Sequence, residues 1–149
     1  MENISLLNLK MVKEKEIKYD FQEKQVTSPS KVVKIATDVL EINEKPEESF
    51  YILTTDTKLK ITGIFEVSRG GVNTTIVHPR EVFKRALLNN AYGIFLLHNH
   101  PSGDPSPSNE DMKTTDRLAE AGKIIGIKVL DHIIIGDDRY VSFKEKRLI

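Results

Sequence analysis

The 149-residue sequence contains no cysteine, and this absence removes several classes of chemistry at once. The chain can form no disulfide, supply no cysteine nucleophile and build no thiolate zinc site. Any transition metal that it binds must therefore be held by His, Asp or Glu. The lack of cysteine is also compatible with a reducing cytoplasm.

Long apolar runs are missing as well. The longest, Ile124–Ile127 and Ile133–Ile135, are far shorter than the ~20 residues that a membrane span needs. The first residues, MENISLLNLKMVKEKE, have no cationic region before their short apolar patch, so we expect no secretory signal. These features predict a soluble, cytoplasmic protein with no membrane partner.

Neither sign of charge is in excess, because 22 Lys and Arg balance 22 Asp and Glu. A domain that holds nucleic acid by its phosphates usually shows a net basic charge. The balance therefore disfavours a nucleic-acid partner, although a local basic patch would still permit one. Hydrophobic residues make up 39% of the chain and charged residues 30%, which is typical of one globular domain with its own core.

Apolar periodicity and turn signals divide the sequence into strands and helices. Stretches rich in β-branched and aromatic residues predict strands at 49–56, 58–68, 72–78, 91–98, 127–136 and 139–143. Helical spacing of apolar residues, with serine or proline at the start, predicts helices at 31–42, at 79–90 and from 108 to about 122. This order implies hairpins and at least one helical crossover. We therefore expect an α/β fold in which helices flank a mixed sheet.

Residues 1–28 differ from the rest in being charged and irregular, and we interpret them as an N-terminal extension. Weak alternation from Leu9 to Phe21 is compatible with an edge strand in this extension. Residues 29–149 then form the folded domain.

The stretch LHNHPSGDPSPSNEDM, residues 97–112, contains the clearest candidate site. His98 and His100 stand two residues apart at the end of a predicted strand, so both imidazoles can point to one side. Asp111 lies in the first turn of the next helix, and the loop before it can fold back to present the carboxylate. Two imidazoles and a carboxylate suit Zn²⁺ with the fourth position open to water, which is the pattern of catalytic sites.

Simpler interpretations fit the same residues. Two histidines in an HxH pattern also occur by chance, and a histidine at a strand end is commonly a surface residue. Ser108 and Asp111 also fit a capping box, in which they only satisfy the free amides of the helix. Spacing alone does not decide between a metal site and a helix cap. It does not match an HNH nuclease, whose catalytic residues are spread over a longer ββα unit.

The whole pattern resembles the JAMM (JAB/MPN) metal-binding motif, with His98-x-His100-Pro101 followed by Ser108-x-x-Asp111. The longer run HNHPSGDPSPSNED is similar to the RadC branch of that superfamily. Flanking matches occur in the same order, as FEVSRG (65–70), VHPREVF (77–83) and VLDHIIIGDDRYVSF (129–143). The resemblance covers about residues 29–145.

This resemblance implies a cytidine-deaminase-like α/β architecture and a zinc metallopeptidase or isopeptidase. His98, His100 and Asp111 would bind one Zn²⁺ per chain. Glu66 matches the upstream glutamate that acts as general base on the metal-bound water, and Ser108 would help to stabilise the oxyanion. The substrate would be a peptide or an isopeptide-linked protein, whose identity the sequence does not give.

The assignment of Glu66 rests on its setting as well as on the match. It lies in the apolar run ITGIFEV, where a carboxylate is costly to bury unless something satisfies it. The competing interpretation is that Glu66 faces solvent while Phe65 and Val67 face the core. His132 and Asp131 could orient a metal ligand from behind, or could be satisfied core residues.

Two other functions compete with the hydrolase. The first is a RadC-type DNA-repair or mobile-element accessory protein that binds nucleic acid. RadC proteins commonly carry an N-terminal helix-hairpin-helix region, for which this sequence has no room, and the balanced charge also disfavours this alternative. The second is a scaffold without metal, which the presence of all the motif residues disfavours.

Overall fold

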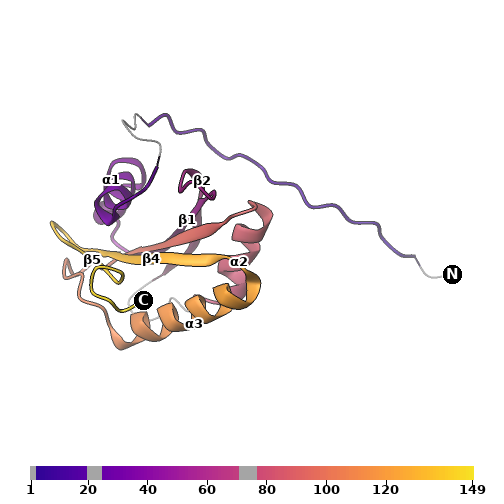
Figure 1. Cartoon of the computed structure of the whole chain (residues 1–149). Helices are drawn as coiled ribbons and strands as arrows, with labels where there is room; N and C mark the ends of the chain where they lie inside the picture. The colour runs from indigo at the N-terminus through magenta and orange to yellow at the C-terminus, as the bar shows by residue number, and fades with distance from the viewer. Residues whose placement is uncertain (1–2, 20–24, 71–76) are drawn as a thin grey trace.

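A single five-stranded sheet organises the chain in the computed structural model, which describes residues 3–19, 25–70 and 77–149 (Figure 1). The sheet order is β2-β1-β3-β4-β5. The strands are β1 (Glu48–Thr55), β2 (Ile61–Gly70), β3 (Gly93–Asn99), β4 (Lys128–Ile135) and β5 (Tyr140–Ser142). The helices are α1 (Pro29–Leu40), α2 (Pro79–Leu88), α3 (Asn109–Ile125) and the short 3-10 helix η1 (Ile42–Glu44). The predicted mixed α/β fold is therefore confirmed.

The pairing of the strands explains where the helices lie. β1 is antiparallel to both β2 and β3, whereas β3 and β4 are parallel. A parallel pair requires a crossover connection, and α3 provides it. All seven residues of β3, GIFLLHN, are buried, as expected for a central strand covered on both faces.

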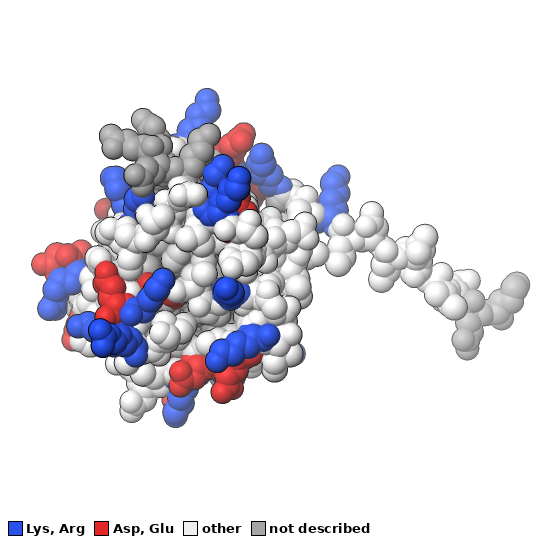
Figure 2. Space-filling view, viewed as in Figure 1, with Lys and Arg blue, Asp and Glu red and all other residues white. Residues whose placement is uncertain are grey.

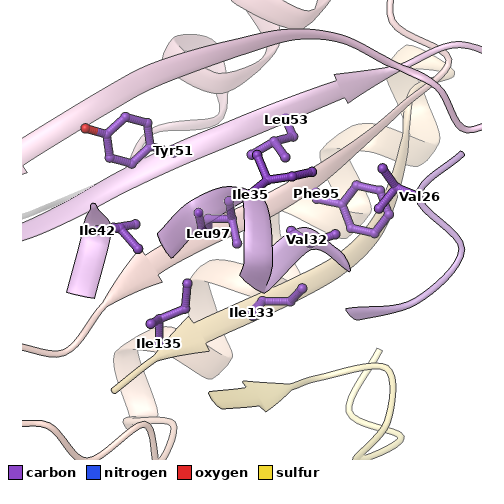
Figure 3. Packing of buried hydrophobic residues seen from close by; sticks show 11 residues of the cluster. Val26, Val32, Ile35, Ile42, Tyr51, Leu53, Phe95, Leu97, Ile133 and Ile135 are labelled. Carbon is purple, nitrogen blue, oxygen red and sulfur yellow. The ribbon is translucent and has the colours of Figure 1, made fainter. Parts of the chain in front are cut away.

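Two apolar cores lie on opposite faces of this sheet. One face, which we call the α1 face, packs against α1 (Figure 3), and the other, the α3 face, packs against α2 and α3. Neighbouring residues of β1 show the alternation directly, because Tyr51 lies in the first core and Phe50 in the second. In β3, likewise, Leu97 belongs to the α1 face and Leu96 to the α3 face.

Two elements differ from the prediction or fall outside what the structure describes. α3 continues to Ile125 and does not end near Gly122, because the left-handed C-cap conformation is taken by Gly126, with φ 86°. Gly122 is instead a buried helical residue that allows α3 to pass close to Ile127. The strand predicted at 72–78 falls largely on residues outside those described.

The N-terminal extension forms no helix or strand between residues 3 and 19, where an edge strand seemed possible. Lys13 and Lys15 interrupt the apolar side of its alternation, and Figure 1 shows this segment leading away from the sheet. Among the described residues, Gln25 is the first that pairs with another strand segment, through an isolated antiparallel bridge with Lys60.

Surface charge is mixed, as the balanced composition predicts. Acidic and basic side chains are interspersed on the face that Figure 2 shows. Across the described ranges, no helix combines the length and the hydrophobicity that crossing a bilayer requires.

Candidate metal centre

The carboxyl end of β3 and the first turn of α3 meet because the crossover that joins β3 to β4 starts there. His98 is a strand residue on the α3 face, and its ring stacks on Phe50 with centroids 5.8 Å apart. His100 follows the strand directly, and its backbone N–H continues the ladder by donating to the carbonyl of Ile135 at 2.9 Å. The two imidazoles therefore emerge on the same side, where Asp111 begins α3.

These three side chains converge on one point. The Nε2 atoms of His98 and His100 lie 3.0 Å apart. The carboxylate of Asp111 reaches both of them, with Oδ1 3.2 Å from His98 Nε2 and Oδ2 3.3 Å from His100 Nε2. Candidate ligand atoms of all three residues lie within 4.8 Å of one another. The structure thus brings together the ligand set that the sequence predicts.

The helix cap and the metal site turn out to use the same residues. Ser108 caps α3, and its hydroxyl accepts a hydrogen bond from the backbone N–H of Asp111 at 3.1 Å. In return, the backbone N–H of Ser108 donates to Asp111 Oδ2 at 2.7 Å. The capping box therefore holds the carboxylate in place beside the histidines, so the two interpretations of Asp111 are compatible.

The donor set fits a bound cation. His100 Nδ1 lies 2.8 Å from the carbonyl oxygen of Asp104, which can only accept, so the ring hydrogen of neutral His100 is on Nδ1. Its Nε2 then presents a lone pair toward His98 Nε2 and toward the carboxylate. Three electron-rich atoms this close repel one another unless a metal ion or a proton lies among them. Two imidazole nitrogens and one carboxylate suit zinc.

The pKa shifts of the cluster have the same origin. The hydrogen bond with the Asp111 carboxylate raises the pKa of His100. Burial alone would raise the pKa of Asp111, but its contacts with His100 and His98 outweigh burial and hold that pKa well below its usual range. The site therefore favours positive charge next to the carboxylate.

The cluster is closed on one side and open on the other. The side chain of His98 is 1% exposed, whereas those of His100 and Asp111 are 16% and 12% exposed. Solvent can thus reach the outer side, as a catalytic rather than a fully enclosed structural metal site requires.

Glu66, the predicted general base, is not brought to this cluster. It lies opposite Tyr51, which lies opposite Leu97, so its side chain projects from the α1 face. Its carboxylate pairs with Arg69, at 2.7 Å and 3.0 Å, and this pairing lowers its pKa. Phe65 and Val67 pack into the apolar core on the α3 side of the sheet, as the competing interpretation expects. The assignment of Glu66 to the site is therefore corrected.

Glu48 is the glutamate that the structure places on the side of the histidines. Phe50 lies opposite His98 in the antiparallel pair of β1 and β3. Glu48 is two residues before Phe50 in β1, and His100 is two residues after His98. Because the two strands run antiparallel, Glu48 therefore lies opposite His100 on the α3 face. Its negative charge contributes to raising the pKa of His100. Glu48 is half-buried and is the first residue of β1.

Asn99, between the two histidines, fixes the segment that carries Glu48. Its Oδ1 accepts from the backbone N–H of Ser49 at 2.8 Å. Its Nδ2 donates to the carbonyls of Lys45 and Glu47 at 3.3 Å and 3.1 Å. The side chain of Asn99 is buried, so these three bonds satisfy it completely and hold residues 45–49 against the end of β3.

Behind the candidate ligands lies His132, whose role the sequence left open. It is fully buried, which lowers its pKa, and its Nε2 lies 2.8 Å from His98 Nδ1. Asp131, by contrast, faces away from the ligands and bonds Ser142 Oγ at 2.6 Å and the backbone N–H of Lys144 at 3.0 Å. His132 therefore contacts the candidate ligand His98, whereas Asp131 anchors the C-terminal segment.

Comparison with known proteins places the chain among a large group of relatives. The family model described as "RadC-like JAB domain" matches residues 26–148. A UPF0758 protein of Caldanaerobacter subterraneus is 53% identical over 121 residues, which are 81% of this chain and 51% of that protein. A UPF0758 protein of Clostridium perfringens is 44% identical over 84% of this chain and 54% of its own length.

An archaeal relative agrees with these bacterial ones. A UPF0758 protein of Methanosarcina mazei is 46% identical over 127 residues, covering 85% of this chain and 55% of that protein. The chain thus spans about half the length of the curated relatives that it matches.

Proposed function

The chain belongs to the RadC-like JAB domain family, and on that premise we propose that it is a zinc-dependent hydrolase of peptide or isopeptide bonds. The observation that carries the proposal is the convergence of His98 Nε2, His100 Nε2 and the Asp111 carboxylate within 4.8 Å. When bound, zinc supplies Lewis acidity and lowers the pKa of coordinated water toward ~7. The remaining steps belong to side chains of this chain.

Glu48 is the residue to which we assign the proton transfers. It lies on the same face of the sheet as the ligands, and Asn99 holds its backbone in place. A carboxylate there accepts a proton from the attacking water and returns it to the leaving nitrogen, so that the amine departs as a neutral group. Glu66 cannot do this from the α1 face, where Arg69 already pairs with it.

Ser108 is proposed to contribute at the opposite side of the reacting carbonyl. Its backbone N–H is already used by Asp111, and its hydroxyl oxygen accepts from the Asp111 N–H, which leaves the hydroxyl hydrogen available. That O–H can donate to an oxygen that gains negative charge in the transition state. Ser108 is exposed at the start of α3, so a substrate can reach it.

The substrate class follows from the reaction. Solvent reaches His100 and Asp111 at the outer side of the cluster, and a general base with one metal ion is the machinery that amide hydrolysis needs. A peptide or an isopeptide-linked protein is therefore the proposed substrate.

A substrate screen tests this function. Zinc-loaded protein is incubated with linear peptides and isopeptide-linked conjugates, and cleavage is followed by mass spectrometry. We expect cleavage that is abolished by a chelator, restored by zinc and absent in the Glu48→Gln variant. No cleavage across the panel, together with DNA binding that persists at about 0.15 M salt, would favour the nucleic-acid alternative instead.

A further inference from the structure

A chain of three short hydrogen bonds runs behind the ligands and links two of them. His98 Nδ1 lies 2.8 Å from His132 Nε2, and His132 Nδ1 lies 2.6 Å from the hydroxyl oxygen of Thr115. That hydroxyl in turn lies 2.7 Å from the backbone carbonyl of Asp111. His98, His132 and Thr115 are each about 99% or more buried, so water does not compete for these contacts. This series of hydrogen bonds therefore joins one predicted ligand, His98, to another, Asp111.

The direction of every hydrogen bond in this chain follows from its last member. A carbonyl oxygen only accepts, so Thr115 must give its single hydroxyl hydrogen to Asp111. The Thr115 oxygen can then only accept, so the hydrogen of its bond with His132 is on His132 Nδ1. His132 enters the contact with His98 through its other nitrogen, Nε2.

Neutral His132 carries a single ring hydrogen, so its Nε2 is an acceptor. The hydrogen of the last bond is then on His98 Nδ1, and Nε2 of neutral His98 is left with a free lone pair. This is the nitrogen that faces Asp111 and His100. The backbone carbonyl of one ligand therefore dictates which nitrogen of another ligand is available.

We propose that Thr115 and His132 are positioning residues that hold His98 in the Nδ1–H tautomer and so prepare its Nε2 for the metal. The proposal rests on the proposed role of His98 as a ligand, and it deepens that role. His100 needs no such relay of hydrogen bonds through other side chains, because its Nδ1 donates directly to the carbonyl of Asp104. Both histidines reach the same tautomer by different means.

The hydrogen bonds also explain why these residue types are needed. Residue 115 needs a hydroxyl, because only a group that both donates and accepts hydrogen bonds can donate to the Asp111 carbonyl and also accept from His132 Nδ1. Histidine at 132 does the same with two ring nitrogens. Partners of this kind, which orient the ligands themselves, typically contribute 10–100-fold to metal affinity.

The tautomers can be measured directly in the unmodified protein. The sequence contains only 4 histidines, so long-range ¹⁵N–¹H spectra of the zinc-free protein at pH 8 can be assigned residue by residue. We expect the ring hydrogen on Nδ1 in both His98 and His132. A hydrogen on Nε2 of neutral His98 would overturn the proposal, whatever any variant does.

Three substitutions in α3 test the role of the hydroxyl. Thr115→Val keeps the shape but removes the hydroxyl, and we expect zinc affinity to fall by about 10–100-fold and the Nδ1–H tautomer of His98 to lose its preference. Thr115→Ser keeps the hydroxyl and should restore both readouts. Thr114→Val is the matched control one position away, where the side chain is half-buried, and should leave both unchanged.

The outcomes separate this proposal from the function on which it rests. If wild type binds zinc and Thr115→Val binds it equally well with unchanged tautomers, the relay is refuted while the metal site stands. If wild type shows the Nδ1–H tautomers but binds no zinc, the relay stands and the proposed hydrolase fails. Should Thr115→Val not fold, the tautomers of the wild type and the zinc affinity of Thr115→Ser still decide.

Discussion

Phe50 of β1 lies directly opposite His98 of β3, and their rings stack with centroids 5.8 Å apart. Residues opposite each other in an antiparallel pair project from the same face, as do residues two apart in one strand. Glu48 therefore shares a face with the candidate ligands. Glu66 lies opposite Tyr51 and projects from the other face. The register of two strand pairs thus determines which glutamate can act on the site.

The two glutamates give a matched pair of variants. Replacing Glu48 with Gln keeps the size of the side chain but removes the proton acceptor, so turnover should fall by roughly 10²–10⁴. Glu66→Gln only weakens an ion pair with Arg69 at the surface, so turnover should stay near that of wild type. Steady-state rates on a cleaved substrate give the comparison.

Zinc content is the control for both variants, since neither glutamate is proposed as a ligand. Both should retain as much zinc as wild type. A large loss of turnover in Glu66→Gln, with Glu48→Gln fully active, would reverse the assignment.

Asn99 should control the position of Glu48 without affecting the metal. Asn99→Ala leaves the backbone N–H of buried Ser49 without its acceptor, which costs about 1–3 kcal/mol. We expect faster hydrogen exchange at the Ser49 amide and slower turnover, with zinc still bound. Asn99→Asp keeps an acceptor for Ser49 and should slow the exchange again relative to Asn99→Ala. Unchanged exchange in Asn99→Ala would show that the asparagine does not hold this segment.

Ser108 and Asp111 separate the two functions of the helix start. Ser108→Ala removes the cap of α3 and should lower stability by about 1 kcal/mol, with zinc retained. Asp111→Ala removes a proposed ligand as well as half of the capping box, so zinc should be lost. Melting temperature and zinc content, measured on both variants, test this. Zinc retained in Asp111→Ala would leave the carboxylate with a capping role only.

Asp131 should make the stability of the fold depend on pH. Burial raises its pKa above the ~3.9 of an unfolded chain, even though Ser142 and the backbone N–H groups of Lys144 and His132 donate to it. The folded state therefore binds the proton more tightly than the unfolded state does. As the pH rises through the folded-state pKa, the carboxylate ionises inside the protein, and this residue's contribution to stability falls.

Asparagine provides the matched control at this position. Asp131→Asn can keep both backbone bonds through its oxygen and can donate its amide to Ser142 Oγ, but it does not titrate. The variant should therefore gain stability relative to wild type as the pH rises. Urea unfolding of the two proteins across acidic to neutral pH measures this, and a difference that does not change with pH would contradict it.

Local pattern was sufficient to predict most elements and the convergence of the candidate ligands. The apolar spacing of residues 31–40 predicts α1, and the continuous run before His98 predicts a buried central strand, because each signal lies within a few residues. His98 and His100 share a side through strand alternation alone. Asp111 joins them because a short loop leads from the strand into the helix.

The residues that sequence reasoning missed depend on pairing between distant segments. Glu48 approaches His100 only because β1 pairs with β3, and Ser49 and Asn99, which bond there, are 50 positions apart in the chain. The role of His132, which the sequence named but left open, likewise depends on a contact with His98, 34 positions away in the chain. Alternation in β2 shows that Glu66 and Phe65 project from opposite faces, but not which face carries the site.

Zinc binding by the histidines decides whether this cluster is a metal centre. Zinc-free protein is titrated with Zn²⁺ in a calorimeter, and the same is done for His98→Ala, His100→Ala and, as control, His78→Ala, whose histidine is exposed at the start of α2. We expect one Zn²⁺ per chain for wild type and His78→Ala, and no stoichiometric binding for His98→Ala or His100→Ala. Full stoichiometric binding by both His98→Ala and His100→Ala, or none by wild type, would contradict this expectation.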